Sequence, residues 1–456
     1  MINISDFINE NRKLLDDCIN DYYSKKANIV DKMYAYCISG DTEQYLNYKI
    51  NRNRTNLKVK TNFIKKFINE ETSYLLSNEP TLISKSGNDD IVNYIKDKFS
   101  SISKSHNKKF CRNLLSFGTA YEFYNIEEDS DGNIIFKVKN GTRHNSYVLE
   151  DENDNIILAM RFFTKPFDTE TYLDIYTNDF IYHADKNLHE VLEPTPNIFG
   201  EVPVSVINIS EYKEYDTLFN ELSALQDAYC TNLSDIVNEI SDYRLAYLIM
   251  TGVQISEEKN EDGKSDIDLM KENGIIVNPN DNARIDFLTK NINDTFIHNT
   301  LETLRKNIYE ISSHVDTNEK LQSNTSGSAL RNRLIGLEQR VRNLEGCMHE
   351  VIIKRIKFMF KLYRILEGID YNYKDIEVKF TLNIPQDDLL TAQTLSQLGI
   401  GENISLKTAL SRLSFVDNPA KEIQDLQEEK LKESQIDYLG YGTAVHGENE
   451  GALDYE

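Results

Sequence analysis

The residues best suited to phosphate chemistry are Gly263, Lys264 and Ser265, which match the end of a phosphate-binding loop. Such a loop also needs a glycine five residues before Gly263, because backbone N–H groups must approach the phosphates closely. Glu258 occupies that position, and its carboxylate would repel a phosphate. We therefore interpret the segment as a turn that carries a lysine, and the sequence predicts no nucleotide site.

Acidic side chains with the spacing of a calcium loop occur at Glu127, Asp129 and Asp131, just before Gly132. A calcium loop of this type ends in a bidentate Glu at its twelfth position, where this chain has Val138. The segment is therefore predicted to be a hairpin turn.

Cysteine and histidine residues do not form a recognisable metal or catalytic motif. Cys347 and His349 are close in sequence, but no second pair of ligands accompanies them. The five cysteines stand singly, which predicts neither a disulfide framework nor a zinc module. Because no nucleophile elbow is present either, we predict no catalytic residue, no metal, no cofactor and no enzymatic activity.

The charge balance limits the kinds of partner. The chain has 51 Lys and Arg against 74 Asp and Glu, a formal net charge of −23, whereas proteins that wrap nucleic acid tightly need clustered cations. Its 456 residues suggest two or three domains, and its apolar runs are too short to span a bilayer. The start, Met1–Asp6, lacks the features of a signal peptide, so we expect a soluble intracellular protein without a membrane partner.

Helical and strand patterns alternate in the first half of the chain. Apolar residues over Phe63–Leu76 recur with the period of an amphipathic helix, which should end before Pro80. From residue 119 to residue 210, short β-rich runs separated by turn residues predict one antiparallel meander. These runs are Thr119–Ile126, Ile134–Val138, Ile156–Phe163, Tyr172–Tyr176 and Phe180–Ala184.

The middle of the chain predicts two helices that could run side by side. Apolar residues recur at helical spacing within residues 216–248 and 294–312, and a polar, acidic insertion separates the two stretches. Short β-like runs flank the insertion, at Leu248–Ile255 and Gly274–Asn278.

The strongest periodic signal runs from Ser328 to Leu366, where apolar residues recur in steps of four and three before Gly368. It predicts a helix on the order of 55 Å long. The stripe suits either a helix buried along one side in a larger body or a two-chain coiled coil. A strand at Ile376–Leu382 follows, and then acidic helices over Asp387–Gln435 with a break at Gly399 to Gly401.

Six motifs in a fixed order give the chain a family resemblance. They are Asn62–Ile68 with Tyr74–Leu76 and Glu79–Pro80, then Phe117–Glu122, Phe199–Val204, Leu233–Asp235, Ser326–Leu330 and Phe380–Pro385. Taken together with the order of helices and strands, they resemble the portal proteins of long-tailed bacteriophages of Gram-positive hosts.

The resemblance implies an α+β, predominantly helical portal fold that assembles into a ring of twelve subunits around a DNA channel. Its regions would be a wing, a stem, a clip, a tunnel loop and a crown. The implied bounds are 1–215 for the wing, 216–248 and 294–312 for the stem helices, 249–293 for the clip, 313–327 for the tunnel loop, 328–386 for the long wing helix and strand, 387–436 for the crown helices and 437–456 for an acidic, disordered tail.

The resemblance also implies a location and partners. The ring would occupy one capsid vertex of the virion, after assembly in the host cytoplasm with scaffolding protein and major capsid protein. The terminase motor and later the head-completion adaptor would dock on it, mainly through the clip. Double-stranded DNA would pass through with weak, non-specific contacts, because a charge of −23 per subunit repels a polyanion.

Candidate site residues follow from these regions. The tunnel-loop residues expected near DNA are Asn318, Lys320, Gln322, Ser323 and Asn324, with Lys320 as the predicted cation. Gly327 and Ser328 would let the loop pivot at the helix start, with Ser328 as its N-cap. An acidic neighbouring subunit could neutralise the basic residues of the long helix. The clip residues expected to bind partners are Glu257, Glu258, Lys259, Asp262 and Lys264.

Two other classes of protein remain open at this point. A coiled-coil structural adaptor of low oligomeric order would form an elongated dimer instead of a ring. A DNA-processing enzyme such as a nuclease would need a clustered metal site, which the sequence does not display.

Overall fold

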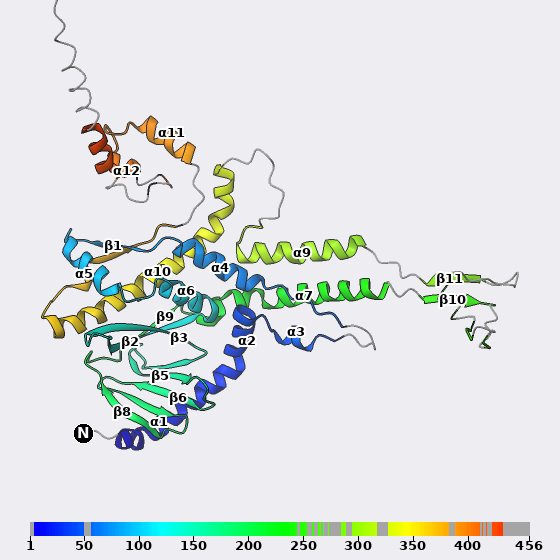
Figure 1. The fold of residues 1–456 in the computed structure, drawn as a ribbon, viewed down its shortest axis with the longest axis horizontal. Helices are drawn as coiled ribbons and strands as arrows, with labels where there is room; N and C mark the ends of the chain where they lie inside the picture. The colour runs from blue at the N-terminus through cyan, green and yellow to red at the C-terminus, as the bar shows by residue number, and fades with distance from the viewer. Residues whose placement is uncertain are drawn as a thin grey trace, which may run out of the picture. The chain divides into compact units, whose positions relative to one another are not determined.

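The computed structural model combines helices with antiparallel sheets, so the predicted α+β class is confirmed (Figure 1). The chain divides into a first unit, residues 1–319 with 334–383, and a second unit, residues 320–333 with 384–456. The residues that the structure describes are 4–49, 56–243, 247–252, 258–259, 263–265, 268, 272, 284–288, 294–316, 327–382, 388–410, 413, 416 and 422–431.

A five-stranded antiparallel meander packs against helix α1 (Ile4–Lys25) in the first unit (Figure 1). Because side chains alternate between the faces of a sheet, one face presents Leu158, Met160 and Phe162 to the helix. The ring of Tyr22 stacks on Phe162 with the centroids 3.9 Å apart. The strands are β4 (Ser146–Glu150), β5 (Ile156–Thr164), β6 (Thr171–Tyr176), β7 (Phe180–Asp185) and β8 (Glu190–Pro196).

Short helical segments continue from α1 towards the centre of the first unit. Val30 and Met33 are buried against Phe117, which ties these segments to helix α6 (His106–Phe117). They are η1 (Lys26–Val30), α2 (Asp31–Tyr34), η2 (Ala35–Ser39) and α3 (Glu43–Asn47).

A separate three-stranded sheet, in the order β3-β2-β9, lies next to the meander. The prediction of a single meander was therefore wrong for its first two strands, β2 (Thr119–Glu128) and β3 (Ile134–Thr142). Strand β2 pairs instead with the distant β9 (Val204–Asn208), because alternation predicts which face of a strand is buried but not its neighbour. Residues from both sheets, including Phe123 and Tyr176, share one core cluster.

Gly118 makes the join between α6 and β2 possible. Its φ is 70°, and a Cβ atom at this position would lie 2.6 Å from the backbone of Lys213. Only glycine fits such a close approach in the left-handed region, which explains why the Phe117–Glu122 motif contains it.

Helices and a two-stranded sheet complete this part of the first unit. Helix α6 contacts β2, β3 and α4, and β1 pairs antiparallel with β12. The predicted helix over residues 63–76 is confirmed, and Asn62 caps it by accepting the backbone N–H of Lys65 at 2.9 Å. These elements are α4 (Phe63–Leu76), β1 (Thr81–Ser84), α5 (Asp89–Phe99), α6 (His106–Phe117), η4 (Tyr373–Asp375) and β12 (Ile376–Lys379).

Helix α10 (Gly327–Glu367) confirms the predicted long helix, and Gly368 ends it with a φ of 69°. Within the first unit its apolar stripe is buried in the same chain, with Val341, Met348 and Val351 at 0% exposure. The stripe therefore forms the core of this chain, as expected for a helix buried along one side in a larger body.

The two helices expected side by side are α7 (Leu218–Tyr243), which follows η3 (Lys213–Asp216), and α9 (Asp294–Ser312) (Figure 1). Beyond them β10 (Tyr247–Thr251) pairs antiparallel with β11 (Arg284–Leu288). The first predicted β-like run overlaps β10, whereas the second, 274–278, lies outside the described residues.

The second unit contains α11 (Asp388–Leu398), α12 (Leu406–Leu410) and a helix over residues 422–431. The predicted break falls between α11 and α12, where Gly399 and Gly401 have φ values of 78° and 92°. The predicted acidic tail lies outside the described residues. In the described part of the chain, no helix has both the length and the apolar character needed to cross a bilayer.

Candidate functional site

The predicted tunnel-loop residues lie between two described ends. Asn318, Lys320, Gln322, Ser323 and Asn324 are outside the described residues, and so is their expected contact with DNA. At the far end, Gly327 begins α10, so Ser328 is the second residue of the helix and not its cap. At the near end, residues 313–316 follow α9 and are described in full.

The segment that leaves α9 is held by specific polar contacts. Ser313 has a φ of 58°, which turns the chain out of the helix. Beyond it, the guanidinium of Arg305 donates from Nε and Nη2 to the two carboxylate oxygens of Asp316, at 2.7 and 2.8 Å. A bidentate pair of this kind fixes direction as well as distance, so the last described residue of the segment is tied back to α9.

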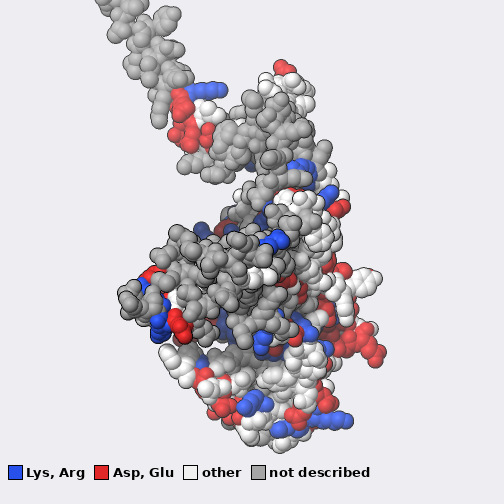
Figure 2. Space-filling model, turned by 90° about the vertical axis from the view of Figure 1, so that its right-hand side faces the viewer, with Lys and Arg blue, Asp and Glu red and all other residues white. Residues whose placement is uncertain are grey.

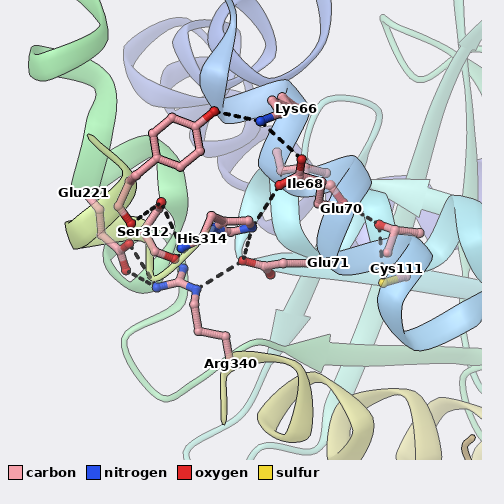
Figure 3. Close-up of polar contacts among 11 residues, drawn as sticks. Lys66, Ile68, Glu70, Glu71, Cys111, Glu221, Ser312, His314 and Arg340 are labelled. Atoms are coloured by element: carbon pink, nitrogen blue, oxygen red, sulfur yellow. Dashed lines mark hydrogen bonds and ion pairs between the residues drawn. The ribbon is translucent and has the colours of Figure 1, made fainter. Parts of the chain in front are cut away.

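A buried charge cluster joins the start of this segment to α4, α7 and α10 (Figure 3). Arg340 of α10 donates from Nε to Glu71 of α4 at 3.1 Å and from Nη1 to Glu221 of α7 at 3.1 Å. The side chain of Glu71 is only 2% exposed, whereas that of Glu221 is 27% exposed. One arginine thus links three helices that are far apart in the sequence.

His314 lies beside this cluster and is neutral at pH 7. Burial lowers the pKa of His314 to about 4, and its ring stacks on Phe67 with the centroids 4.1 Å apart. Its Nδ1 is 2.8 Å from the carbonyl oxygen of Ser312, so the ring proton resides on Nδ1 and is donated to that carbonyl. Its Nε2 lies 3.8 Å from a carboxylate oxygen of Glu71 and makes no hydrogen bond to the residues that the structure describes.

Lys66 adds a second connection between α4 and α9. Its Nζ donates to the hydroxyl of Tyr309 at 2.7 Å and lies 3.3 Å from Glu70 (Figure 3). The rings of Phe67 and Tyr309 meet edge to face with the centroids 5.2 Å apart. Together these contacts hold the C-terminal end of α9, where the predicted tunnel loop begins, against the buried face of α4.

A second buried ion pair connects α10 to β2. Arg355 donates from Nε and Nη2 to both carboxylate oxygens of Glu122, at 3.0 and 2.6 Å, and His106 Nε2 lies 2.8 Å from the same carboxylate. Burial opposes ionisation of Glu122, but Arg355 and His106 outweigh it and lower its pKa to about 2.

The pKa of Glu71 is shifted in the opposite direction. Burial raises the pKa of Glu71 to about 7, and the nearby carboxylates of Glu221 and Glu70 act in the same direction. Arg340 lowers the pKa, but it contacts Glu71 through one nitrogen and shares its charge with Glu221. The cluster at the loop start therefore contains a carboxyl group that changes its protonation state near pH 7.

The basic residues of α10 pair within the chain to a greater extent than we expected. Arg340 and Arg355 have the partners just described, and Lys357 and Lys361 both lie within 2.8 Å of Glu201. The expectation that a neighbouring subunit neutralises them is wrong for these four residues. Their partners lie more than 100 residues away in sequence, so no local pattern indicates the pairing.

Residues expected to bind partners in the clip are described only in part. Glu258 and Lys259 are exposed, and Lys264 pairs with Glu272. Glu257 and Asp262 lie outside the described residues. The turn at Asp129 agrees with the predicted hairpin, since its carboxylate accepts the backbone N–H groups of Asp131 and Asn133.

Charge is mixed over the coloured part of one face (Figure 2). On the face drawn in Figure 2, Lys and Arg side chains are interspersed with Asp and Glu over the residues that are coloured there. Among the described residues, no three side chains of His, Cys, Asp or Glu group together as metal ligands.

Sequence analysis did not single out Glu71, Glu122, His314, Arg340 or Arg355. A signal was present for the arginines, because each lies within the apolar stripe of α10: Arg340 between Leu337 and Leu344, and Arg355 between Ile352 and Met359. A charge on the buried face of a helix needs a buried partner. The partner itself cannot be identified without the fold.

The family model described as "Phage portal protein, SPP1 Gp6-like" matches residues 9–435, nearly the whole described chain. The chain belongs to this family of phage portal proteins. A curated relative, the portal protein of Bacillus phage SPP1, is 21% identical over 403 residues, which cover 82% of this chain and 76% of that protein.

Two solved structures of gene transfer agent particles are also similar. A chain from the neck of an empty particle covers 76% of this chain and 86% of its own length, and a chain from the native virion covers 79% and 87%. Both are 10% identical to this chain with a TM-score of 0.41. As a portal protein, the chain is a structural component of the virion at the capsid vertex.

Proposed function

We propose that the chain assembles into a ring of twelve subunits through which the genome is packaged and later ejected. The observation that carries this proposal is the family match over residues 9–435, which includes every helix and strand from α3 to α12. The protein would act as a conduit and a docking platform, without an enzymatic activity of its own. The energy for DNA movement would then come from a partner.

We assign the regions of the ring as follows. Residues 1–215, with the helix and strand of 328–386, form the wing, and residues 387–436 form the crown. The stem consists of 216–248 and 294–312, which contain α7 and α9, and the clip lies between them at 249–293.

The tunnel loop is assigned to residues 313–327, between the end of α9 and the start of α10. The contacts of Arg305 with Asp316 and of His314 with Phe67 support this assignment, because they fix the point from which the loop departs. Asn318, Lys320, Gln322, Ser323 and Asn324 would contact DNA phosphates weakly, and Gly327 and Ser328 would allow the loop to pivot.

The partners follow from the same assignment. The clip, with Glu257, Glu258, Lys259, Asp262 and Lys264, would dock the terminase during packaging and the head-completion adaptor afterwards. Scaffolding protein and major capsid protein would associate with the ring during assembly in the host cytoplasm. Since each subunit carries a formal charge of −23, the channel would repel DNA enough to let it slide.

The mass of the purified protein, with negative-stain images of the same sample, tests the ring. We expect a particle near twelve times 52.8 kDa with a central hole. An elongated dimer would contradict the proposal and favour a coiled-coil adaptor. If the protein alone is a monomer, capsids assembled with it decide the question, and the chain must then appear at a single vertex.

A charge variant tests the tunnel loop within assembled particles. We expect Lys320→Gln to reduce the amount of packaged DNA, measured by quantitative PCR of nuclease-treated particles. Lys306→Gln, at an exposed position on α9, removes the same charge outside the loop and should package normally. If the two variants package equal amounts of DNA, Lys320 does not make the proposed contact with DNA.

A further inference from the structure

A cavity of about 500 Å³ lies in the first unit, away from the cluster at the start of the predicted tunnel loop. Five segments form its walls: the extended segment Glu79–Leu82, the C-terminal end of α5, the loop between α5 and α6, the start of α6 and the middle of α10. Nothing in the proposed movement of DNA through a ring requires this cavity.

The floor of the cavity contains a buried cation with unused hydrogen-bonding capacity. Arg355 lines the cavity, yet its side chain is only 2% exposed. Its Nε and Nη2 donate to Glu122, whereas Nη1 makes no hydrogen bond to the described residues. A guanidinium binds a second oxyanion readily through such a free edge, because its donors are fixed in one plane.

Other groups around the cavity also favour an anion. Lys96 and Lys104 are exposed at its wall, and Glu79 is the only acidic residue among the described residues that line it. The twelve-residue helix α6 begins here, and Ser105 at its N-cap makes no side-chain hydrogen bond to the helix. In the first turn, the backbone N–H of His106 donates to the carbonyl oxygen of Ser103 at 2.8 Å, whereas those of Asn107 and Lys108 have no acceptor among the described residues and remain available as donors.

Two features indicate a peptide and not a free inorganic anion. Asn107 lines the cavity, and its buried Oδ1 atom has no hydrogen-bond partner among the described residues, so the site offers an acceptor that suits an amide N–H. Leu82, Phe99, Ile102 and Ile352 add apolar walls. In addition, β1 pairs with β12 alone among the described strands, so an extended chain could run along its other side.

We propose that this cavity binds an acidic peptide segment of another protein chain. A carboxylate of the segment accepts hydrogen bonds from Nη1 of Arg355 and from the first turn of α6, while Lys96 and Lys104 attract it. A backbone N–H of the segment donates to Asn107, and an aliphatic side chain next to the carboxylate packs against Phe99 and Ile352.

Fluorescence anisotropy with a labelled eight-residue peptide of alternating Leu and Asp tests this proposal on the full-length protein. We expect saturable binding, at least about tenfold weaker when Asn replaces Asp in the peptide, because hydrogen bonds to charged groups are the stronger ones. The variant Lys96→Gln/Lys104→Gln should weaken binding by a similar factor. Lys13→Gln/Lys32→Gln removes the same charge at exposed positions on α1 and α2 and should bind normally.

Further measurements distinguish a peptide from inorganic phosphate and from DNA, and they include the results that would overturn the proposal. Asn107→Ala should weaken peptide binding several-fold while leaving any inhibition by inorganic phosphate unchanged. Equal binding of the Asn peptide, or no binding at millimolar concentration, would overturn the proposal. A DNA duplex should be compared with inorganic phosphate at the same concentration of phosphate groups. If the duplex displaces the peptide, and if the Lys96→Gln/Lys104→Gln variant no longer shows this displacement, the proposal would be overturned in favour of a nucleic-acid contact.

Discussion

Two buried glutamates have pKa values that shift in opposite directions, because different charges and hydrogen-bond donors surround them. The side chains of Glu122 and Glu71 are 0% and 2% exposed, and each pairs with an arginine of α10. Glu122 receives two hydrogen bonds from Arg355 and lies beside His106, so the ionised form is stable despite burial. Glu71 receives one hydrogen bond from an arginine that it shares, so burial dominates.

Glu122→Gln should be strongly destabilising at pH 7. The change leaves the buried guanidinium of Arg355 without a counter-charge, for which we expect a loss of about 3–5 kcal/mol in the free energy of unfolding. Urea denaturation followed by circular dichroism measures it. Glu350→Gln, which breaks an exposed pair with Lys354 on the same helix, should cost less than about 0.5 kcal/mol.

The pH dependence of this loss has a defined sign. The pKa of Glu122 is lowered from 4.5 to about 2 in the folded protein, so its contribution is present above pH 4.5 and disappears as the pH falls to 2. The difference between wild type and Glu122→Gln should therefore narrow over that range. If the difference in stability between the two proteins stays constant with pH, the ion pair of Glu122 with Arg355 is not the source of that difference.

Glu71→Gln should have the opposite pH signature. The pKa of Glu71 is raised from 4.5 to about 7 in the folded protein, so folding retains a proton that the unfolded chain releases. Wild-type stability should consequently fall as the pH rises from 4.5 to 7, and the variant should lack this decline. We expect the stability of the variant relative to wild type to increase by roughly 1–3 kcal/mol over this range.

The same denaturation series at several pH values provides the control for Glu71. Glu350→Gln, whose side chain is 54% exposed and does not act on Glu71, should show the same pH dependence as wild type. If Glu71→Gln instead loses the same amount of stability at every pH between 4.5 and 7, then Arg340 depends on the charge of Glu71 and not only on its shape.

At the scale of elements, helix periodicity was predictable and strand pairing was not. The repeat of apolar residues in α10 shows directly which face is buried, and both helices α7 and α9 were found within their predicted ranges. The strands β2 and β9 are separated by 75 residues, which contain β3 and the whole meander, and no local pattern indicates that they pair. The buried ion pairs were also not predictable from the sequence, because Arg340 and Arg355 pair with residues of other helices and strands.

Two glycines of α10 form a matched pair for testing how closely the helix approaches the start of the predicted tunnel loop. A Cβ atom at Gly336 would lie 2.9 Å from Cβ of Ser313, whereas one at Gly346 would meet nothing within 4 Å. We expect Gly346→Ala to stabilise the protein by about 0.5–1 kcal/mol, because alanine favours the helix. Gly336→Ala should destabilise it by about 1–3 kcal/mol through overpacking.

Urea denaturation of both glycine variants measures this difference. Both variants replace glycine by alanine in the same helix, so the effect of helix propensity on the free energy of unfolding cancels when the two are compared. The remaining difference reports the contact with Ser313. If both variants are stabilised, residue 313 must be able to move away from α10 at little cost, and the first residues of the predicted loop are then not fixed.

At the scale of the whole molecule, the distribution of charge affects the assembly of the proposed ring more than any single ion pair does. Each subunit carries a formal charge of −23, yet the buried pairs of α10 use glutamates of the same chain. Those cations are therefore not available to attract a neighbouring subunit or DNA. We therefore expect the proposed ring to be held together mainly by contacts that do not depend on opposite charge.

Assembly of the proposed ring should accordingly respond to salt in one direction. Like-charged subunits repel one another, and the range of that repulsion shrinks from about 30 Å at 0.01 M salt to about 8 Å at 0.15 M. We expect the fraction of subunits in rings to rise with NaCl at fixed protein concentration, as measured by mass photometry. If salt dissociates the rings instead, complementary charges on the subunit surface must hold them together, and the pairing within each chain cannot account for the balance of charge at the interface.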